Sequence, residues 1–404
     1  MVNLTNIEEA RTRILGRLKR TPCIYAQVVS EAIGANVFLK LENLQTTGSF
    51  KERGALNRLL TLTDEEKQNG VIAASAGNHA QGVAFHATRL GIESTIVMPE
   101  GTPLVKVSRT SEYGAKVILH GKNYDESFAH AADLAKKNRS FLVHAYDDEE
   151  IISGQGTVAF EILEQCPDVD VCIVPVGGGG LLSGIATVMA NQDKPVTCFG
   201  VEHQDIPSMQ AALESGGPVE LQPKATIAEG IAVRRVGVLC HAICREHVAG
   251  FASVSDDEIA RAILYLMERE KTVAEGAGAT GLAALLARKL DFVKGKNVVV
   301  LVCGGNIDVN VISRIIEKGL VERGRLARFA VQVRDRPGAL AQVLKLAAQT
   351  GVNVVEVHHE RAFLVGELGE VSLEIVVETR GKSHLTELHK VLKENGFQML
   401  AQSS

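Results

Sequence analysis

The chain has 404 residues, of which 46% are hydrophobic and 23% are charged, and its formal net charge is −5. This composition is typical of a globular protein of roughly two to three domains and excludes a disordered chain. The slight acidic excess and the absence of tryptophan argue against nucleic acid or a membrane surface as a partner.

Short runs rich in valine and isoleucine alternate with longer helical patterns along most of the chain. The predicted strands are 71–74, 94–98, 116–119, 141–144, 171–176, 197–201 and 297–302. Because these runs are apolar almost throughout, we expect parallel strands that helices cover on both faces. The alternation of strand and helix therefore predicts a doubly wound α/β body.

The pattern changes near Gly324, where a different order of elements begins. We expect a strand at 329–333, a helix at 338–349, strands at 352–358 and 371–378, a helix at 384–394 and a strand at 397–400. The order β-α-β-β-α-β predicts a separate ferredoxin-like α+β domain. We therefore expect a body over residues 1–322, with a smaller subdomain at about 52–147, and a tail domain over 327–404.

The N-terminus and the cysteines indicate a cytoplasmic protein. The first residues lack the basic start and the apolar core of a signal peptide. Apolar runs such as 298–302 are too short to span a bilayer. No Cys-x-x-Cys pair occurs among the seven cysteines, so we expect reduced thiols.

A run of four glycines, Gly177–Gly180, follows the predicted strand 171–176 and precedes a helix-like stretch. Without Cβ atoms, successive backbone N–H groups can approach an anion, and the helix dipole adds favourable potential. We interpret the run as a phosphate-binding loop. A Walker sequence is absent, and the third glycine of a dinucleotide fingerprint is missing. Because Glu202 mimics a ribose-binding acid, a nicotinamide-dependent oxidoreductase remains an alternative.

Three more segments contain candidate functional groups. Lys51 stands between Phe50 and a glycine-containing turn, and a lysine in a dry pocket has a lowered pKa and can attack a carbonyl. Residues 75–82 follow a strand and open a helix, where backbone N–H groups can hold a carboxylate. Residues 303–308, Cys-Gly-Gly-Asn-Ile-Asp, follow the apolar strand 297–302. By contrast, the Gly-x-Gly-x-x-Gly pattern at 276–281 follows a charged stretch, so we expect it to be a close-packing loop.

Together these motifs resemble those of the fold-type II pyridoxal-phosphate enzymes, and within them the threonine ammonia-lyases, also called threonine dehydratases. The resemblance covers about residues 1 to 320. It rests on Ser-Phe-Lys-Glu-Arg-Gly at 49–54, Ser-Ala-Gly-Asn-His-Ala-Gln-Gly at 75–82, the tetraglycine, and Gly-Gly-Asn-Ile-Asp at 304–308. The tail, with Asp-Arg-Pro-Gly-Ala-Leu at 335–340, resembles an ACT domain, a module that often binds amino acids.

The resemblance implies that Lys51 binds pyridoxal 5'-phosphate covalently and is the catalytic base. Phe50 and Gly230 match the residues against the two faces of the cofactor ring, and Asn78 matches the partner of its 3-hydroxyl. The implied phosphate cradle is Gly177, Gly178, Gly179, Gly180 and Leu181. Cys303 matches the position that faces the pyridine nitrogen, where relatives usually have serine or threonine. With cysteine, as with serine or threonine, the group that faces the pyridine nitrogen is not a carboxylate.

The resemblance also implies the reaction, deamination of L-threonine to 2-oxobutanoate and ammonia, with L-serine giving pyruvate as a secondary activity. The implied substrate loop, which holds the carboxylate, is Ser75, Ala76, Gly77, Asn78 and His79. His79 alone is more typical of a structural histidine than of a base. Serine racemases have a second serine where this chain has Ala76, which favours elimination. Glu202 and Asp205 match a metal site of some relatives incompletely, so a metal is unassigned.

The tail implies allosteric regulation by an amino-acid or nucleotide effector. Asp335 and Gly338 place a turn beside a helix N-terminus, which suits a carboxylate, and Asn353 on the next strand is expected to orient the ligand. We expect a homodimer or a homotetramer. The preference for threonine or serine, the effector, and a catabolic role or one in isoleucine biosynthesis stay open. An amino-acid-sensing protein with a vestigial catalytic body is a second alternative.

Overall fold

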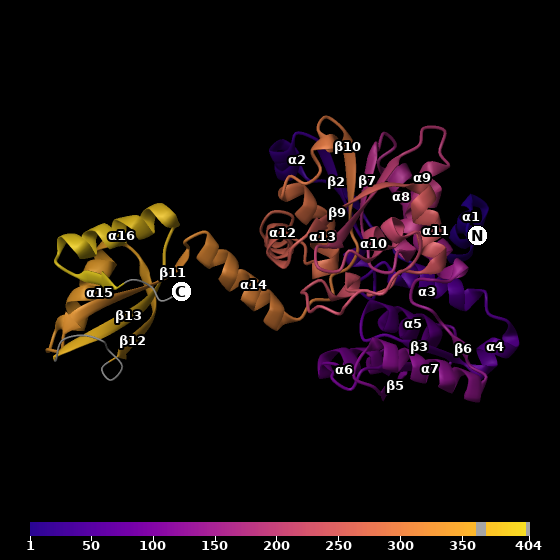
Figure 1. The fold of residues 1–404 in the computed structure, drawn as a ribbon, viewed down its shortest axis with the longest axis horizontal. Coiled ribbons are helices and arrows are strands. Elements are labelled where there is room, and N and C mark those ends of the chain that lie inside the picture. Colours follow the sequence, from indigo (N-terminus) through magenta and orange to yellow (C-terminus); the bar gives the residue numbers. More distant parts are fainter. Residues whose placement is uncertain (361–368, 401–404) are drawn as a thin grey trace. The chain divides into compact units, whose positions relative to one another are not determined.

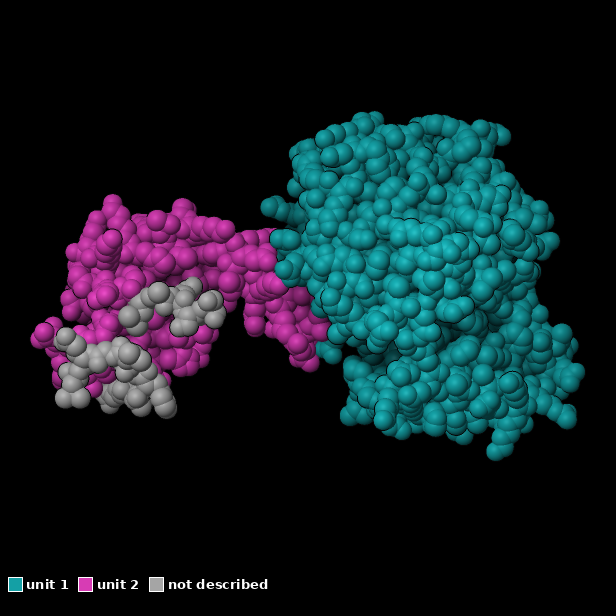
Figure 2. All heavy atoms as spheres, in the orientation of Figure 1, with its two compact units in different colours: residues 1–308 teal, residues 309–404 magenta. Residues whose placement is uncertain are grey.

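The structure is a computed structural model that describes residues 1–360 and 369–400. The chain forms two compact units, residues 1–308 and residues 309–404, which Figures 1 and 2 show. Helix α14 (Val309–Glu322) belongs to the second unit, whereas the expected boundary at residue 322 lies after this helix. Among the helices of the described residues, none has the length and apolar character that a bilayer span requires.

A six-stranded sheet forms the centre of the first unit. Its order is β1 (Cys23–Tyr25), β2 (Asn36–Leu41), β10 (Asn297–Val302), β7 (Val171–Pro175), β8 (Thr197–His203) and β9 (Val248–Val254). Only the β1–β2 pair is antiparallel among these neighbours. Every residue of β7 is buried, as expected for a strand covered on both faces.

Helices surround this sheet (Figure 1). They are α1 (Leu4–Ile14), α2 (Gln27–Ile33), α8 (Glu149–Gln165), α9 (Gly180–Ala190), α10 (Ser208–Ser215), α11 (Val238–His247), α12 (Asp256–Glu268) and α13 (Gly276–Leu286). Short 3-10 turns lie at η1 (Glu42–Leu44), η2 (Glu229–Ile231) and η3 (Asp291–Val293). The doubly wound α/β body expected from the sequence is confirmed.

A second, smaller sheet of the first unit is wholly parallel. Its order is β5 (Lys116–Leu119), β4 (Ser94–Met98), β3 (Val71–Ala74) and β6 (Phe141–Leu142). Its helices are α3 (Lys51–Leu60), α4 (Asp64–Asn69), α5 (Asn78–Arg89), α6 (Leu104–Glu112) and α7 (Tyr124–Asn138).

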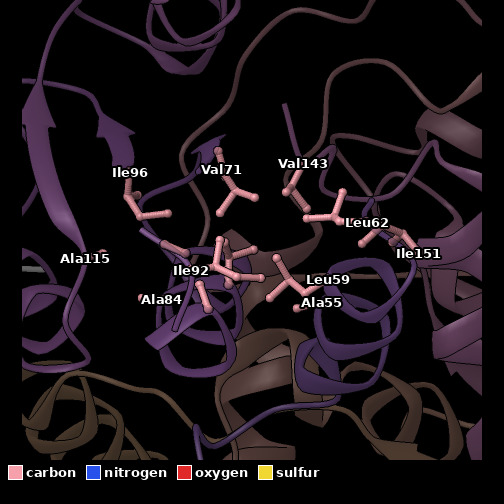
Figure 3. Packing of buried hydrophobic residues seen from close by; sticks show 14 of the residues in the cluster. Ala55, Leu59, Leu62, Val71, Ala84, Ile92, Ile96, Ala115, Val143 and Ile151 are labelled. Carbon is pink, nitrogen blue, oxygen red and sulfur yellow. The ribbon is translucent and has the colours of Figure 1, made fainter. Parts of the chain in front are cut away.

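Figure 3 shows the main core of this smaller part. Leu59 from α3, Val71 from β3 and Ile96 from β4 are buried together in one hydrophobic cluster. Ile151, from α8, belongs to the same cluster. Because α8 packs on both α3 and α9, this core joins the smaller sheet to the larger part of the first unit.

The second unit has the predicted β-α-β-β-α-β order. Its elements after α14 are β11 (Leu326–Arg334), α15 (Ala339–Thr350), β12 (Asn353–Glu360), β13 (Glu370–Glu378), α16 (Lys382–Glu394) and β14 (Gln398–Leu400). The sheet order is β12-β13-β11-β14, and all its pairs are antiparallel. One face of the sheet is buried against the two helices, around Phe329, Leu373 and Leu388. The expected ferredoxin-like α+β fold is therefore confirmed.

Candidate active site

The candidate site lies where strands β3, β7 and β10 of the two sheets end. The Phe50 N–H, at the start of α3, donates to the carbonyl of Cys303, just after β10, at 3.0 Å. Ser49 and Gly304 form a single β-bridge beside it. These contacts place Phe50, Lys51 and Cys303 together, as expected for a site at the carboxyl ends of parallel strands.

The Lys51 amine is enclosed by the protein. Its Nζ donates to the Ala145 carbonyl at 2.7 Å and lies 5.3 Å from the centroid of the Phe50 ring. Burial lowers the pKa of Lys51 to about 8, although Cys303, Cys240 and Glu275 oppose the shift electrostatically. An amine with this pKa is partly neutral near pH 7, so it can act as a nucleophile or a base.

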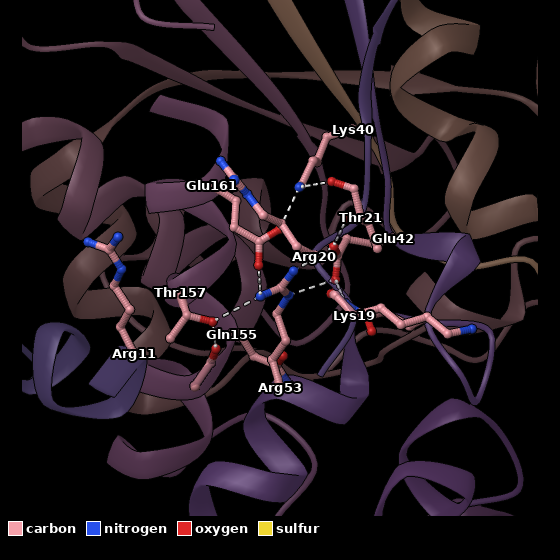
Figure 4. Close-up of polar contacts among 12 residues, drawn as sticks. Arg11, Lys19, Arg20, Thr21, Lys40, Glu42, Arg53, Gln155, Thr157 and Glu161 are labelled. Atoms are coloured by element: carbon pink, nitrogen blue, oxygen red, sulfur yellow. Dashed lines mark hydrogen bonds and ion pairs between the residues drawn. The ribbon is translucent and has the colours of Figure 1, made fainter. Parts of the chain in front are cut away.

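A buried ion network anchors the first turn of α3 (Figure 4). The Arg53 guanidinium binds Glu42 through two hydrogen bonds of 2.7 and 2.8 Å. It also pairs with Glu161 at 2.7 Å, and Glu161 binds Lys40 Nζ at 2.6 Å. Arg53 is two residues beyond Lys51, so the network fixes the helix that presents the amine. The sequence analysis did not identify this network.

The tetraglycine is a turn that several backbone segments approach closely. Gly179 has φ of 97°, and a Cβ on Gly178 would overlap the Tyr146 ring. A Cβ on Gly177 would stand 3.0 Å from the Ile231 Cα. No side chain caps the first turn of α9, which starts at Gly180 and Leu181. Its first N–H groups therefore suit an anion such as a phosphate.

The start of α5 resembles that of α9. The N-cap residue of α5 is Gly77, which has no side chain. The first N–H groups of this helix therefore also lack a side-chain acceptor from the N-cap residue. Ser75 Oγ accepts a hydrogen bond from the Gly77 N–H at 3.1 Å. Ala76 is half-buried and packs against the core of the smaller sheet. Asn78 is the first helical residue. A carboxylate fits this helix start.

His79 is buried and uncharged at neutral pH. Its Nε2 contacts the Val143 carbonyl at 3.2 Å. Burial, together with the smaller effect of the nearby Lys51 charge, lowers the pKa of His79 to about 3. A histidine with this pKa offers neither a positive charge nor a useful base near pH 7, which agrees with the structural interpretation of this residue.

Asn78 is bound by two residues that are remote in the sequence. Its Nδ2 donates to Glu275 Oε1 at 2.7 Å, and its Oδ1 accepts from Asn306 Nδ2 at 2.8 Å. Burial raises the pKa of Glu275 to about 7. A Cβ on Gly230 would stand 3.4 Å from Glu275 Oε1, so Gly230 lies beside the Glu275 carboxylate.

The sequence analysis missed Glu275, which comes directly before the glycine pattern at 276–281. As expected, these glycines allow close packing, because Cβ atoms on Gly276 and Gly278 would overlap the carbonyls of Ile227 and Gly304. The pattern lies on α13, a helix rather than the expected loop. The sequence signal that could have revealed Glu275 is its position as an acidic residue directly before the first residue of a glycine-rich helix.

Cys303 is a buried, neutral thiol beside Lys51. It is 3% exposed, and burial raises its pKa well above the ordinary value. A neutral thiol is a weak hydrogen-bond donor and brings no negative charge to the site. Cys240 lies nearby, with its Sγ 3.5 Å from the Tyr146 carbonyl.

Glu202 is used within the protein. Its carboxylate accepts from the N–H groups of Met209 and Gln210 at 2.7 and 3.0 Å, and so caps α10. Asp205 pairs separately with Lys224 at 2.8 Å. Among the residues that the structure describes, no group of three or more His, Cys, Asp or Glu side chains could hold a metal. Because both carboxylate oxygens of Glu202 already accept hydrogen bonds from α10, the structure does not favour Glu202 as the ribose-binding acid of a nicotinamide-dependent oxidoreductase.

The three effector candidates of the second unit do not lie together in one copy. Asp335 directly follows β11, and Gly338 caps α15 at the same end of the sheet. Asn353 pairs with Glu378 of β13, and Glu378 pairs with Leu326, the first residue of β11. Asp335, by contrast, follows Arg334, the last residue of β11, which pairs with Glu370. The separation along the strand is about 26 Å. A small ligand in one copy therefore cannot contact both Asp335 and Asn353.

Comparison with known proteins agrees with this site. Residues 14–304 match the family model described as pyridoxal-phosphate dependent enzyme. The chain is 45% identical to an L-threonine ammonia-lyase of Thermotoga maritima over 99% of both chains. It is 43% identical to one of Geobacter sulfurreducens over 98% of both chains.

Solved structures give the same result. The processed form of threonine deaminase isoform 2 from Solanum lycopersicum is 35% identical, with a TM-score of 0.73 over 78% of this chain and 88% of that chain. Maize serine racemase is 31% identical, with a TM-score of 0.75 over 80% of this chain and 99% of that chain. A buried amine of low pKa, a neutral thiol and two uncapped helix starts fit this cofactor. The chain belongs to the family of pyridoxal-phosphate-dependent enzymes.

Proposed function

We propose that the chain is an L-threonine ammonia-lyase, which converts L-threonine to 2-oxobutanoate and ammonium. The observation that carries the proposal is the buried Lys51 amine, with a pKa of about 8, which lies 5.3 Å from the centroid of the Phe50 ring and interacts electrostatically with Cys303. The names of the relatives that match nearly the whole chain support the choice of substrate.

Different residues around Lys51 bind different parts of the cofactor in this proposal. When bound, pyridoxal phosphate supplies an electron sink for the pair left at the substrate Cα. Gly177–Gly180 and Leu181, at the uncapped start of α9, hold its phosphate. Phe50 and Gly230 would lie against its ring, Asn78 would bind its 3-oxygen, and Cys303 would face its pyridine nitrogen. A thiol there, unlike a carboxylate, does not hold a proton on that nitrogen.

Lys51 acts as the general base. Its free Nζ removes the Cα proton of threonine, and the lowered pKa leaves a larger fraction of the amine neutral near pH 7 than an ordinary lysine would have. The N–H groups at the start of α5, from Ser75 to His79, hold the substrate carboxylate and so orient the Cα–H bond. Loss of the β-hydroxyl as water and hydrolysis of the resulting enamine give 2-oxobutanoate and ammonium.

Ala76 favours elimination over racemisation. A racemase needs a proton donor on the substrate face opposite the lysine, and a methyl group cannot donate a proton. L-Serine, which also has a β-hydroxyl, is the secondary substrate and yields pyruvate.

The second unit, in this proposal, is an ACT domain through which an amino-acid or nucleotide effector regulates the enzyme. The β-α-β-β-α-β order and the turn at Asp335–Gly338 support it. We further propose a cytoplasmic homodimer or homotetramer, with Asp335, Gly338 and Asn353 in effector binding. Because Asn353 is remote from Asp335 in one copy, an effector that contacts both would lie between two copies.

The test is turnover by the purified full-length protein loaded with pyridoxal phosphate. We expect equal amounts of ammonium and 2-oxobutanoate from L-threonine. Lys51→Ala should lower the rate by at least about a hundredfold. Lys116→Ala, which changes an exposed lysine on β5, should not. Release of 2-oxobutanoate by Lys51→Ala at the parental rate would refute the assignment.

A further inference from the structure

A buried carboxylate that the proposed function does not use, that of Glu275, contacts the candidate site. Glu275 is the N-cap residue of α13, yet its side chain makes no cap bond with its own helix. Instead, Oε1 accepts from Asn78 Nδ2 at 2.7 Å, and the Asn306 backbone N–H also binds the carboxylate. Both partners are donors, so a group that only accepts hydrogen bonds suits this position.

These contacts hold the Asn78 carboxamide in one orientation. Its Oδ1 accepts from Asn306 Nδ2 at 2.8 Å, and the same Nδ2 donates to the Thr47 carbonyl at 2.7 Å. Reversing the Asn78 amide would bring its NH2 group against the NH2 group of Asn306. Glu275 takes one of the two hydrogens on Asn78 Nδ2, and the second is left for another acceptor.

The surroundings of Glu275 show that it lies beside the reacting groups. Its carboxylate interacts electrostatically with Lys51 and Cys303. Lys106 and Glu229 are the other charged groups that act on it. The Asn78 amide and Gly304, which follows Cys303, are its immediate neighbours.

We propose that Glu275 is a positioning residue for the bound cofactor, which fixes the Asn78 carboxamide so that the second Nδ2 hydrogen meets the cofactor's 3-oxygen. The inference rests on the proposed function, in which Asn78 binds that oxygen. A purely structural Glu275 would only satisfy two buried donors. The two roles differ in one respect, since only the positioning role depends on the presence of a 3-oxygen in the ligand.

The experiment measures the affinity of the cofactor-free full-length protein for two ligands by spectroscopic titration. One ligand is pyridoxal 5'-phosphate, and the other is its analogue without the 3-hydroxyl group. The variants are Glu275→Leu, which removes the acceptor, and Glu275→Gln, whose NH2 group would face one of the two donors. Glu229→Gln is the matched control, because it removes a neighbouring exposed charge.

Above pH 8, where a Glu275 with a pKa of about 7 is ionised, we expect Glu275→Leu to lower the affinity for pyridoxal phosphate about tenfold, as for loss of a buried hydrogen bond to a charged group. Affinity for the 3-deoxy analogue should change less than about twofold, because it lacks the atom that Asn78 binds. Glu275→Gln should give an intermediate loss, and Glu229→Gln should match the parent with both ligands. The absorbance maximum of the bound cofactor should shift in the Glu275 variants alone.

An equal loss with both ligands, or no loss with either, would overturn the positioning role. If Glu275→Leu does not fold, as circular dichroism shows, Glu275→Gln gives the same comparison. Threonine turnover by the parent is measured in parallel. A parent that binds pyridoxal phosphate without releasing 2-oxobutanoate would contradict the proposed function, while the two-ligand comparison would still decide the role of Glu275.

Discussion

Arg53 and Glu42 form a bidentate ion pair in the interior of the protein, with Nε–Oε2 at 2.7 Å and Nη2–Oε1 at 2.8 Å. The two side chains are 2% and 0% exposed. The pair fastens α3 to η1, and Lys51 lies at the start of that helix. Buried ion pairs are expensive to break because the remaining charge keeps its desolvation cost.

Arg53→Leu should therefore destabilise the protein strongly. We expect the free energy of unfolding to fall by about 3–5 kcal/mol, because the buried Glu42 carboxylate loses its paired cation and Glu161 keeps only Lys40. Urea denaturation followed by circular dichroism measures the change. The control is Arg20→Ala, which breaks an exposed pair with Glu164 and should cost less than about 1 kcal/mol. Equal decreases in the free energy of unfolding of the two variants would show that the buried pair stabilises the protein no more than an exposed pair does.

Much of this architecture could be predicted from the sequence, because strand and helix periodicity is local. The apolar strands, the tetraglycine turn and the β-α-β-β-α-β order of the tail all depend on residues close together in the chain. The contact between Asn78 and Glu275 joins residues 197 positions apart, and no periodicity encodes it. The same is true of Arg53 and Glu161, which meet only when α3 packs on α8.

The tail shows a different limit of sequence reasoning. Asp335 and Asn353 are close in sequence, so the same ligand site was expected for both. Helix α15 spans the length of the sheet between them, and the parallel direction of β11 and β12 places Asn353 at the far end. Strand direction follows from the topology, so motif spacing alone could not reveal this separation.

Ala76→Ser should introduce racemisation of L-serine. The change places a hydroxyl group at the start of α5, where the parent has only a methyl group, and so supplies a proton donor that the site lacks. Chiral chromatography of the serine pool measures D-serine. Ala80→Ser, a buried change on the same helix, is the control for simple disturbance of α5. If Ala76→Ser makes no more D-serine than the parent, Ala76 does not limit the reaction.

His79 should make the stability of the cofactor-free protein sensitive to acid. Its pKa in the folded state is about 3, below the ordinary histidine value of about 6.5, so the folded state binds fewer protons than the unfolded state between these values. The contribution of His79 to stability is therefore complete above about pH 6.5, and it falls by up to about 1.4 kcal/mol for each pH unit towards pH 3. In His79→Gln, which keeps a donor for the Val143 carbonyl, this slope should be shallower. Identical slopes from urea denaturation at pH 5 and 7 would contradict the prediction.

Removal of the tail domain should separate catalysis from regulation. The groups around Lys51 all come from the first unit, so a chain that ends after Arg325 should keep its basal threonine turnover. The sheet that contains Asp335, Gly338 and Asn353 is lost in this variant, so the response to an effector should be lost with it. Effector titration of both chains at fixed threonine measures this response, over a panel of amino acids and nucleotides.

Thermodynamic linkage supplies a second measurement on the intact chain. An inhibitor that weakens substrate binding must itself bind more weakly, by the same factor, when substrate is present. Asp335→Ala, which leaves both units in place, should weaken the effector without changing turnover in its absence. If an identified effector shifts the saturation curve of the truncated chain as much as that of the intact chain, its site lies in the first unit, and the regulatory role proposed for the tail is wrong.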